Sequence, residues 1–130
     1  MRTKIEDIGE IELLNRLRKF MRSGAIDDDV AEIKKIKKSL LINTDLLVEE
    51  IHFSEKISSA KDIGWKSITT NVSDLICSGS NTIISFNVGL VVPPNTELKW
   101  VENLYEGMFK AMKEFGGEII GGDCSAGAKK

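Results

Sequence analysis

The sequence predicts an α/β fold, an α/β sandwich in which helices pack on one face of a mixed β-sheet. Three observations lead to this prediction. Apolar residues recur at helical spacing in three segments, β-branched runs of strand length lie between them, and Gly or Pro marks most of the boundaries. The expected order is one helix followed by β-β-α-β-α-β. With 130 residues, the chain is long enough for a single domain, 1–130, with its own core.

The first helix is expected over about residues 9–21, because apolar side chains recur there with helical periodicity. Ser23-Gly24 then ends it. The apolar positions are Ile11, Leu14, Leu17 and Met21.

Two strands are expected next, over residues 30–33 and 39–43. The lysine-rich run 34–38 joins them and is interpreted as a solvated hairpin tip, since lysine commonly protects strand edges. Residues 46–59 are rich in Glu and Ser and are predicted to form a polar loop of functional length.

Ser59 is a good N-cap for a helix over about 60–78, which has a broad apolar face. A long buried strand is expected over 82–92, and Pro93-Pro94 ends it.

A second long helix is predicted over 98–115, closed by Gly116-Gly117. Tyr105 lies on its apolar side and is expected in the core with its hydroxyl at the rim. A short final strand is expected over 118–121, followed by a turn at 121–125.

Composition excludes several classes of function. A net charge of −2 argues against a nucleic-acid partner, because binding to phosphate backbones needs a basic surface. No apolar stretch is long enough to span a membrane and no signal core follows the N-terminus, so the cytoplasm is the predicted location. Cys77 and Cys124 lie far apart and the chain has a single His, which argues against structural zinc.

Acidic residues in unexpected contexts give the main functional signal. Three of the four acidic segments interrupt or end apolar runs, where an ionised carboxylate needs a partner. Divalent cations satisfy that need, so the set predicts an oxygen-ligand Mg²⁺ site for a phosphate-bearing substrate. Each segment alone is equally typical of a turn or helix cap. The segments are Asp27-Asp28-Asp29, Asn43-Thr44-Asp45, Asn71-Val72-Ser73-Asp74 and Gly121-Gly122-Asp123.

Other candidate residues give weaker signals. Gly121-Gly122 before Asp123 permits close approach of a phosphate to the backbone, although a simple turn explains it equally well. The sequence has no P-loop motif. His52, the single imidazole, follows an apolar run and lies in the polar loop beside acidic residues.

Four motifs, in the right order, resemble the N-terminal domain of the thiamine-monophosphate kinase family, within the aminoimidazole ribonucleotide synthetase-like superfamily. Residues 43–53 are similar to the family pattern T-D-x-L-V-E-x-x-H-F. Residues 62–79 resemble D-x-G-W-K-x-x-x-x-N-x-S-D-L-x-x-x-G. The runs W-V-E-x-L-Y-x-G at 100–107 and G-G-D-C-S at 121–125 complete the series. The Trp-Lys and Val-Glu-x-x-His-Phe elements are specific to the kinase within the superfamily.

The resemblance implies transfer of the γ-phosphate of ATP to thiamine monophosphate, giving thiamine diphosphate, with several Mg²⁺ ions between the two substrates. It also implies a homodimer in which the sheets of two N-terminal domains pair. His52 falls on a substrate-contacting position, Tyr105 near the nucleotide, and Gly122 with Asp123 on a nucleotide-binding turn. The implied metal positions are Asp28, Asn43, Thr44, Asp45, Asp74 and Asp123.

Two departures from the family leave alternatives open. The first acidic loop of the family usually reads G-D-D-A-A-V, whereas residues 27–32 read D-D-D-V-A-E, and Asp28 is preferred to Asp29 for its spacing to Asp45. The C-terminal domain of the family is absent from these 130 residues. The chain is therefore also interpreted as a non-catalytic dimerisation and nucleotide-binding module. A further alternative is a superfamily member acting on a purine-pathway amidine or on selenide.

Overall fold

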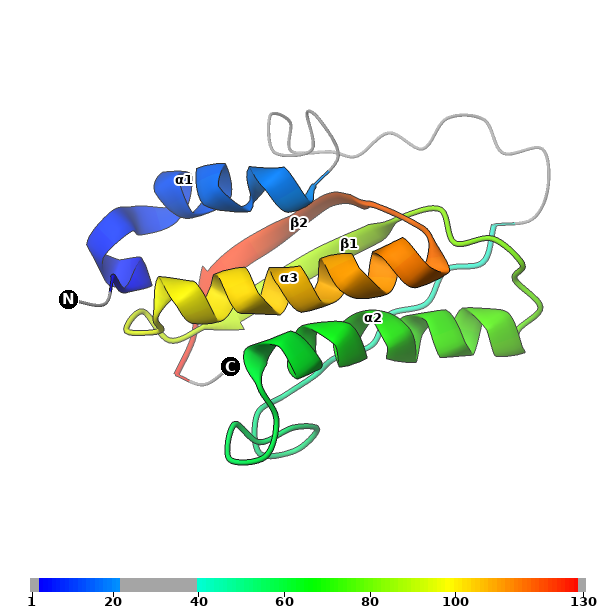
Figure 1. The fold of residues 1–130 in the computed structure, drawn as a ribbon, viewed down its shortest axis with the longest axis horizontal. Coiled ribbons are helices and arrows are strands. Elements are labelled where there is room, and N and C mark those ends of the chain that lie inside the picture. The colour runs from blue at the N-terminus through cyan, green and yellow to red at the C-terminus, as the bar shows by residue number, and fades with distance from the viewer. Residues whose placement is uncertain (1–2, 22–39, 129–130) are drawn as a thin grey trace.

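The computed structural model describes residues 3–21 and 40–128. Within them, β1 and β2 pair in parallel as a two-stranded sheet (Figure 1). The elements in chain order are α1 (Ile5–Leu17), the 3₁₀ turn η1 (Arg18–Phe20), α2 (Ala60–Cys77), β1 (Phe86–Val92), α3 (Leu98–Phe115) and β2 (Ile119–Ala126).

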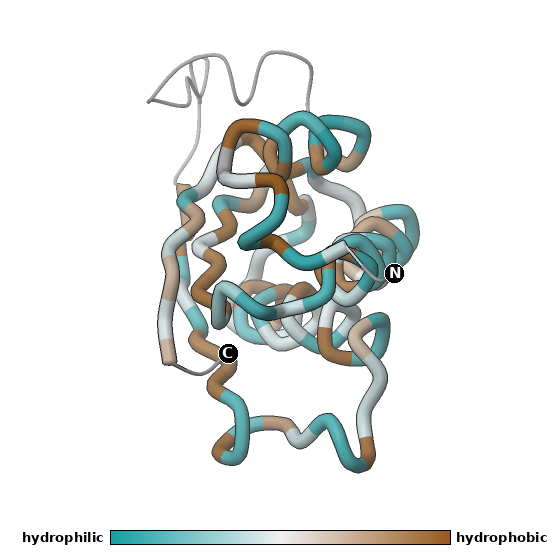
Figure 2. Tube along the Cα trace, turned by 90° about the vertical axis from the view of Figure 1, so that its left-hand side faces the viewer, coloured by the Kyte–Doolittle hydropathy of each residue, from teal (hydrophilic) through white to brown (hydrophobic). Residues whose placement is uncertain are grey.

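The helices lie on one face of the sheet, which confirms the predicted α/β fold. Figure 1 shows α3 across the two strands, with α1 on one side of it and α2 on the other. The view in Figure 2 places the strands on one side of the molecule and the helices on the other. In the described parts of the chain, no helix is both long and apolar enough to cross a membrane. The largest of the fully buried side chains are Leu17, Val101, Tyr105 and Ile119.

The first helix begins at Ile5, four residues earlier than predicted. The backbone N–H of Lys4 donates to the Asp7 carboxylate at 2.8 Å, which stabilises a helical turn before the apolar pattern starts. Gly9, with φ of 72°, interrupts the helix close to the predicted start. Met21 already lies in a parallel bridge to Ile119, so the helical segment ends before it.

The second helix begins where the sequence predicts because its N-terminus carries a capping box. The Ser59 hydroxyl accepts from the Asp62 N–H at 3.2 Å, and the Asp62 carboxylate accepts from the Ser59 N–H at 3.1 Å. Hydrogen bonds from the Ser59 side chain and backbone lower the pKa of Asp62. The predicted helices over 60–78 and 98–115 are both confirmed to within one residue.

Helices α2 and α3 approach each other so closely that two glycines are required. A Cβ added at Gly64 would overlap the carbonyl oxygen of Leu104 on α3. A Cβ added at Gly107 would overlap the carbonyl oxygen of Lys61 on α2. Because each helix contributes one glycine, the two backbones are in direct contact at both places.

Strands β1 and β2 begin or end at other residues than the sequence predicts. The first begins at Phe86 instead of residue 82. The last was predicted over 118–121 with a turn after it, and this was wrong, because β2 continues to Ala126. The reason is the parallel register, which pairs 121–126 with 87–92 residue by residue. Position 122 requires a glycine, because a Cβ at this position would overlap the carbonyl oxygen of Val88.

The predicted hairpin before α2 is not seen in the described residues. Residues 40–43 are not in a strand, and Ile42 is 79% exposed. The other predicted strand, 30–33, lies outside the described residues together with the lysine-rich run that follows it. A short apolar segment forms a strand only where a neighbouring strand pairs with it, and among the described residues 40–43 has none.

Candidate functional site

Two of the predicted metal-binding side chains meet although they lie 31 residues apart. The Asn43 amide donates to the Asp74 carboxylate, with 3.3 Å between Nδ2 and Oδ2. Asp74 lies in the last turn of α2, and its backbone carbonyl accepts from the Ser78 N–H that ends the helix. The contact therefore joins the segment before the polar loop to the C-terminal end of α2.

A large cavity of about 1350 Å³ adjoins this contact. Asn43, Thr44 and Asp45 line it from one side. Ser67 and Asn71 line it from α2, and residues 86–92 of β1 line it from the sheet. The cavity thus brings one carboxylate together with several neutral oxygen donors, the ligand types that Mg²⁺ prefers.

Asn71 and Ser67 contact each other within this wall. The Asn71 amide donates to the Ser67 backbone carbonyl at 2.9 Å, which leaves the Asn71 side-chain oxygen as an acceptor. Ser67 on α2 and Asn87 on β1 both line the cavity, and neither was among the predicted site residues. The signal that could have identified Ser67 is its position one helical turn before Asn71.

Asp123 is not brought into this group. It lies on β2 opposite Gly89, and its carboxylate accepts a hydrogen bond from the Ser125 hydroxyl at 3.1 Å. Among the described residues, no three His, Cys, Asp or Glu side chains are close enough together to hold one metal ion. Asp28 lies outside the described residues.

Gly122 and Asp123 were predicted on a nucleotide-binding turn. The structure places both on the extended strand β2 instead, so their backbone is already paired with β1. Both residues are exposed.

Tyr105 is buried in the core, with only 1% of its surface exposed. Its ring packs against Phe20, with 5.9 Å between the ring centroids. Burial, together with the nearby Cys124, raises the pKa of the Tyr105 hydroxyl far above its usual value. The group therefore stays protonated, and it lies beneath the sheet close to Cys124 on β2.

His52 lies exposed in a compact turn of the polar loop. Its ring nitrogen Nδ1 accepts from the Val48 N–H at 3.0 Å, and its backbone carbonyl accepts from Lys66 Nζ at 2.6 Å. The loop extends beyond the N-terminal end of α2 in Figure 1.

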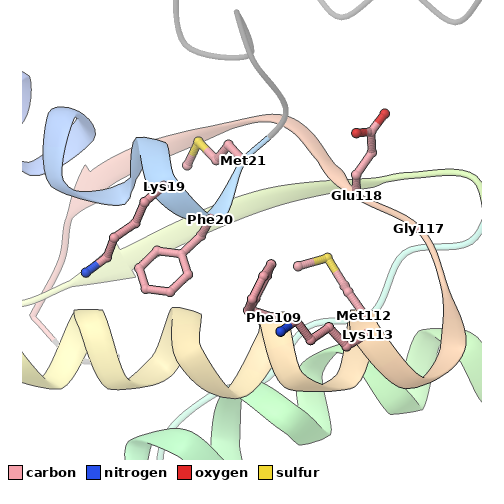
Figure 3. A pocket seen from close by; sticks show the side chains of 8 residues that line it. All are labelled: Lys19, Phe20, Met21, Phe109, Met112, Lys113, Gly117 and Glu118. Atoms are coloured by element: carbon pink, nitrogen blue, oxygen red, sulfur yellow. The ribbon is translucent and has the colours of Figure 1, made fainter.

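A second, smaller pocket of about 230 Å³ lies between η1 and the C-terminal half of α3. Figure 3 shows Phe20 directed from η1 toward α3, and Phe109 and Met112 directed from α3 into the gap. Lys19, Lys113 and Glu118 stand around it. Its floor is apolar and a single carboxylate borders it, so it lacks the donor set of a magnesium site.

Comparison with known proteins identifies the class. The family model "AIR synthase related protein, N-terminal domain" matches residues 27–130, and the chain belongs to this family. The particular relatives that it resembles are thiamine-monophosphate kinases. It is 52% identical over 126 residues to that of Prochlorococcus marinus, a match covering 97% of this chain and 38% of the relative.

More distant relatives agree. Identity to the thiamine-monophosphate kinase of Aquifex aeolicus is 33% over 129 residues, covering 97% of this chain and 40% of the relative. A crystal structure of thiamine monophosphate kinase from Aquifex aeolicus matches with a TM-score of 0.63 and 31% identity, covering 98% of this chain and 41% of that one. The structure of AaThiL complexed with AMPPCP and TMP matches with the same TM-score and 32% identity, covering 98% of this chain and 40% of that one. The chain spans about two fifths of the length of the curated relatives it matches.

Proposed function

We propose that this chain is the N-terminal part of a thiamine-monophosphate kinase, which transfers the γ-phosphate of ATP to thiamine monophosphate and forms thiamine diphosphate. The observation that carries the proposal is the contact of Asn43 with Asp74 beside the large cavity, because these residues belong to two different motifs of the resemblance. The names of the relatives support the reaction. The solved relative bound to AMPPCP and TMP supports the two ligands.

Mg²⁺ would be held at this site by Asn43, Thr44, Asp45 and Asp74. Their donors are carboxylate, amide, hydroxyl and carbonyl oxygens, and this set fits a hard divalent cation. When bound, the ions neutralise the negative charge of the phosphates, and in phosphoryl transfer most of the catalysis is such neutralisation together with positioning. We assign Asp123 and Asp28 to further metal ions of the same reaction.

The other assigned residues act on the substrates. His52 would contact thiamine monophosphate from its exposed loop. Gly122 is assigned to the nucleotide, which would meet the exposed backbone of β2 at this residue. Tyr105, being buried, would lie near the nucleotide and hold β2 in place through the core without touching the ligand.

A homodimer is part of the proposal. Its support is the exposed apolar side chains of residues 40–46 together with a β1 edge that pairs with nothing in the described part of the chain. Such an edge is a template for a further strand. We assign the chain to one domain, residues 1–130, and the activity to the cytoplasm.

The test is phosphorylation of thiamine monophosphate by ATP and Mg²⁺ in the full-length protein that carries this chain. Asp45→Asn and Asp74→Asn are each expected to reduce turnover by at least about a hundredfold, as loss of a charged group at a phosphoryl-transfer site does. Glu12→Gln is the control, because Glu12 pairs with Arg16 on α1 and not with the site. Unchanged turnover in both aspartate variants would contradict the metal assignment.

A second candidate function is a non-catalytic dimerisation and nucleotide-binding module, which the exposed apolar side chains of residues 40–46 favour. Sedimentation would then show a dimer, while ATP turnover would stay absent at saturating Mg²⁺. A different substrate within the superfamily would instead be detected with a panel of phosphate acceptors.

A further inference from the structure

The turn that carries His52 is closed by its own backbone. The N–H groups of Ile51 and His52 both donate to the Val48 carbonyl, at 3.2 and 2.8 Å, and the Glu50 N–H donates to the Phe53 carbonyl at 2.7 Å. Glu50 has φ of 66°, in the left-handed region that costs a non-glycine residue free energy. The backbone hydrogen bonds of the turn therefore accompany a conformation at Glu50 that is costly by itself and needs support from the surrounding contacts.

The same turn selects the protonation of the imidazole. The Val48 N–H donates to His52 Nδ1 at 3.0 Å, and a ring nitrogen that accepts a hydrogen bond carries no proton. In the neutral ring the proton is then on Nε2. The exposed end of His52 is consequently a hydrogen-bond donor in the neutral state.

Lys66 links this turn to helix α2. Its ammonium donates to the His52 carbonyl at 2.6 Å, a charge-assisted hydrogen bond between residues 14 positions apart. Lys66 lies on α2 two residues after Gly64, where the backbones of α2 and α3 touch. Lys66 itself is exposed, on a helix whose backbone is held against α3 at Gly64.

We propose that Lys66 is a positioning residue: from α2 it holds the 48–53 turn in the shape in which His52 Nδ1 accepts from Val48 and Nε2–H faces the substrate as a donor. The ligand atom that His52 meets is then an acceptor, such as a phosphate oxygen. This inference rests on the proposed function for the identity of the ligand, and on the described contacts alone for the geometry.

Nitrogen NMR of the ¹⁵N-labelled 130-residue chain tests the geometry, because the sequence contains a single His and its two ring nitrogens are unambiguous. We expect a pyridine-type Nδ1, a pyrrole-type Nε2, and a scalar coupling through the hydrogen bond between Nδ1 and the Val48 amide nitrogen. In Lys66→Met the coupling should disappear. In Lys66→Arg it should persist, because the guanidinium can donate to the same carbonyl.

Lys61→Met is the matched control, since Lys61 lies on the same helix but pairs with Glu106 on α3. It should leave the His52 signals unchanged, and the dispersed amide spectrum of each variant verifies that it is folded. A protonated Nδ1 in the unmodified chain at neutral pH would overturn the proposal. So would a coupling that survives in folded Lys66→Met.

Titration with thiamine monophosphate then separates this inference from the proposed function. Lys66→Met is expected to weaken binding about tenfold, the ratio that corresponds to one hydrogen bond, while Lys66→Arg stays near the original affinity. If the coupling depends on Lys66 but thiamine monophosphate never shifts Nε2, the positioning role stands and the assigned substrate is contradicted.

Discussion

The contact between α2 and α3 and the neighbouring segment 40–53 are built in opposite ways. Between the helices, backbone touches backbone at Gly64 and Gly107, and apolar side chains such as Leu104 are almost fully buried. Segment 40–53 instead exposes apolar side chains and borders a large cavity. Its described links to α2 include the Asn43–Asp74 and Lys66–His52 hydrogen bonds.

This difference separates the part of the structure that supports the fold from the part that is proposed to bind ligands. Close packing of apolar groups supplies most of the free energy of folding, so the helix pair can fix the shape of the molecule. A few polar contacts supply little net stability, but they fix the relative positions of the polar side chains that they join. The candidate site is therefore linked to the closely packed helix pair through a small number of polar contacts.

The largest predicted effect comes from removing a core side chain on one side of the comparison. Leu104→Ala should lower the free energy of unfolding by about 3 kcal/mol, because it leaves a cavity at a residue that is only 4% exposed. Ile42→Ala, at a position 79% exposed, should change it by less than about 0.5 kcal/mol. Urea unfolding of the two variants measures both values. Equal losses would contradict the contrast between the regions.

The next effect concerns the glycine at the helix contact. Gly107→Ala should cost about 1–3 kcal/mol in unfolding free energy, because the added methyl group forces α2 away from α3. Gly89→Ala on β1 is the matched variant, since an added Cβ there meets nothing within 4 Å. Thermal unfolding should show a lower midpoint for the first and a nearly unchanged one for the second. An unchanged unfolding midpoint in Gly107→Ala would mean that α2 and α3 can move apart without a loss of stability.

A smaller, pH-dependent effect comes from the ion pair that joins the same helices. A hydrogen bond from Lys61 lowers the pKa of Glu106, with 2.6 Å between Nζ and Oε2. A lowered pKa gives stability that is complete above the unfolded value near 4.3 and is lost as the pH falls through the folded value. Because both groups are partly exposed, Glu106→Gln should cost at most about 1 kcal/mol at neutral pH.

Unfolding curves across pH measure this pair directly. The difference between the unmodified chain and Glu106→Gln should be constant above about pH 5 and should shrink toward zero in acid. A difference that grows on acidification would contradict the lowered pKa of Glu106.

The smallest stability effect is expected at the candidate site. Asp74→Asn should change the free energy of unfolding by less than about 0.5 kcal/mol, because the side chain is exposed and its described hydrogen bond to Asn43 is long. It should nevertheless weaken the response of Asn43 and Asp45 amide signals to added Mg²⁺. A stability loss as large as that of Leu104→Ala would show that Asp74 is structural.

The sequence predicted the helices well because their signals are local. Ser59 and Asp62 form the cap that starts α2, and the spacing of apolar residues marks both long helices. The length of β2 could not be found in this way, because Gly-Gly-Asp-Cys-Ser has the composition of a turn. The close approach of the Val88 carbonyl on β1 explains why this strand has a glycine at position 122.

The candidate site shows the same limit. The motifs identified Asn43 and Asp74 separately, but their contact spans 31 residues and depends on how segment 40–48 runs beside α2. The hydrogen bond from Lys66 to the His52 carbonyl also depends on how the segment that carries His52 runs beside α2. Local patterns carry no information about such distances, whereas side-chain chemistry did predict polar ligands at both Asn43 and Asp74.

Hydrogen exchange of backbone amides tests the central contrast most directly. In the absence of ligands, amides of α2 and α3 should be the best protected and those of 40–53 among the least protected. Mg²⁺, thiamine monophosphate and a non-hydrolysable ATP analogue together should then raise protection in 40–53 and leave the centres of α2 and α3 unchanged. Protection of 40–53 that already equals that of the helices, or that does not respond to these ligands, would contradict the account.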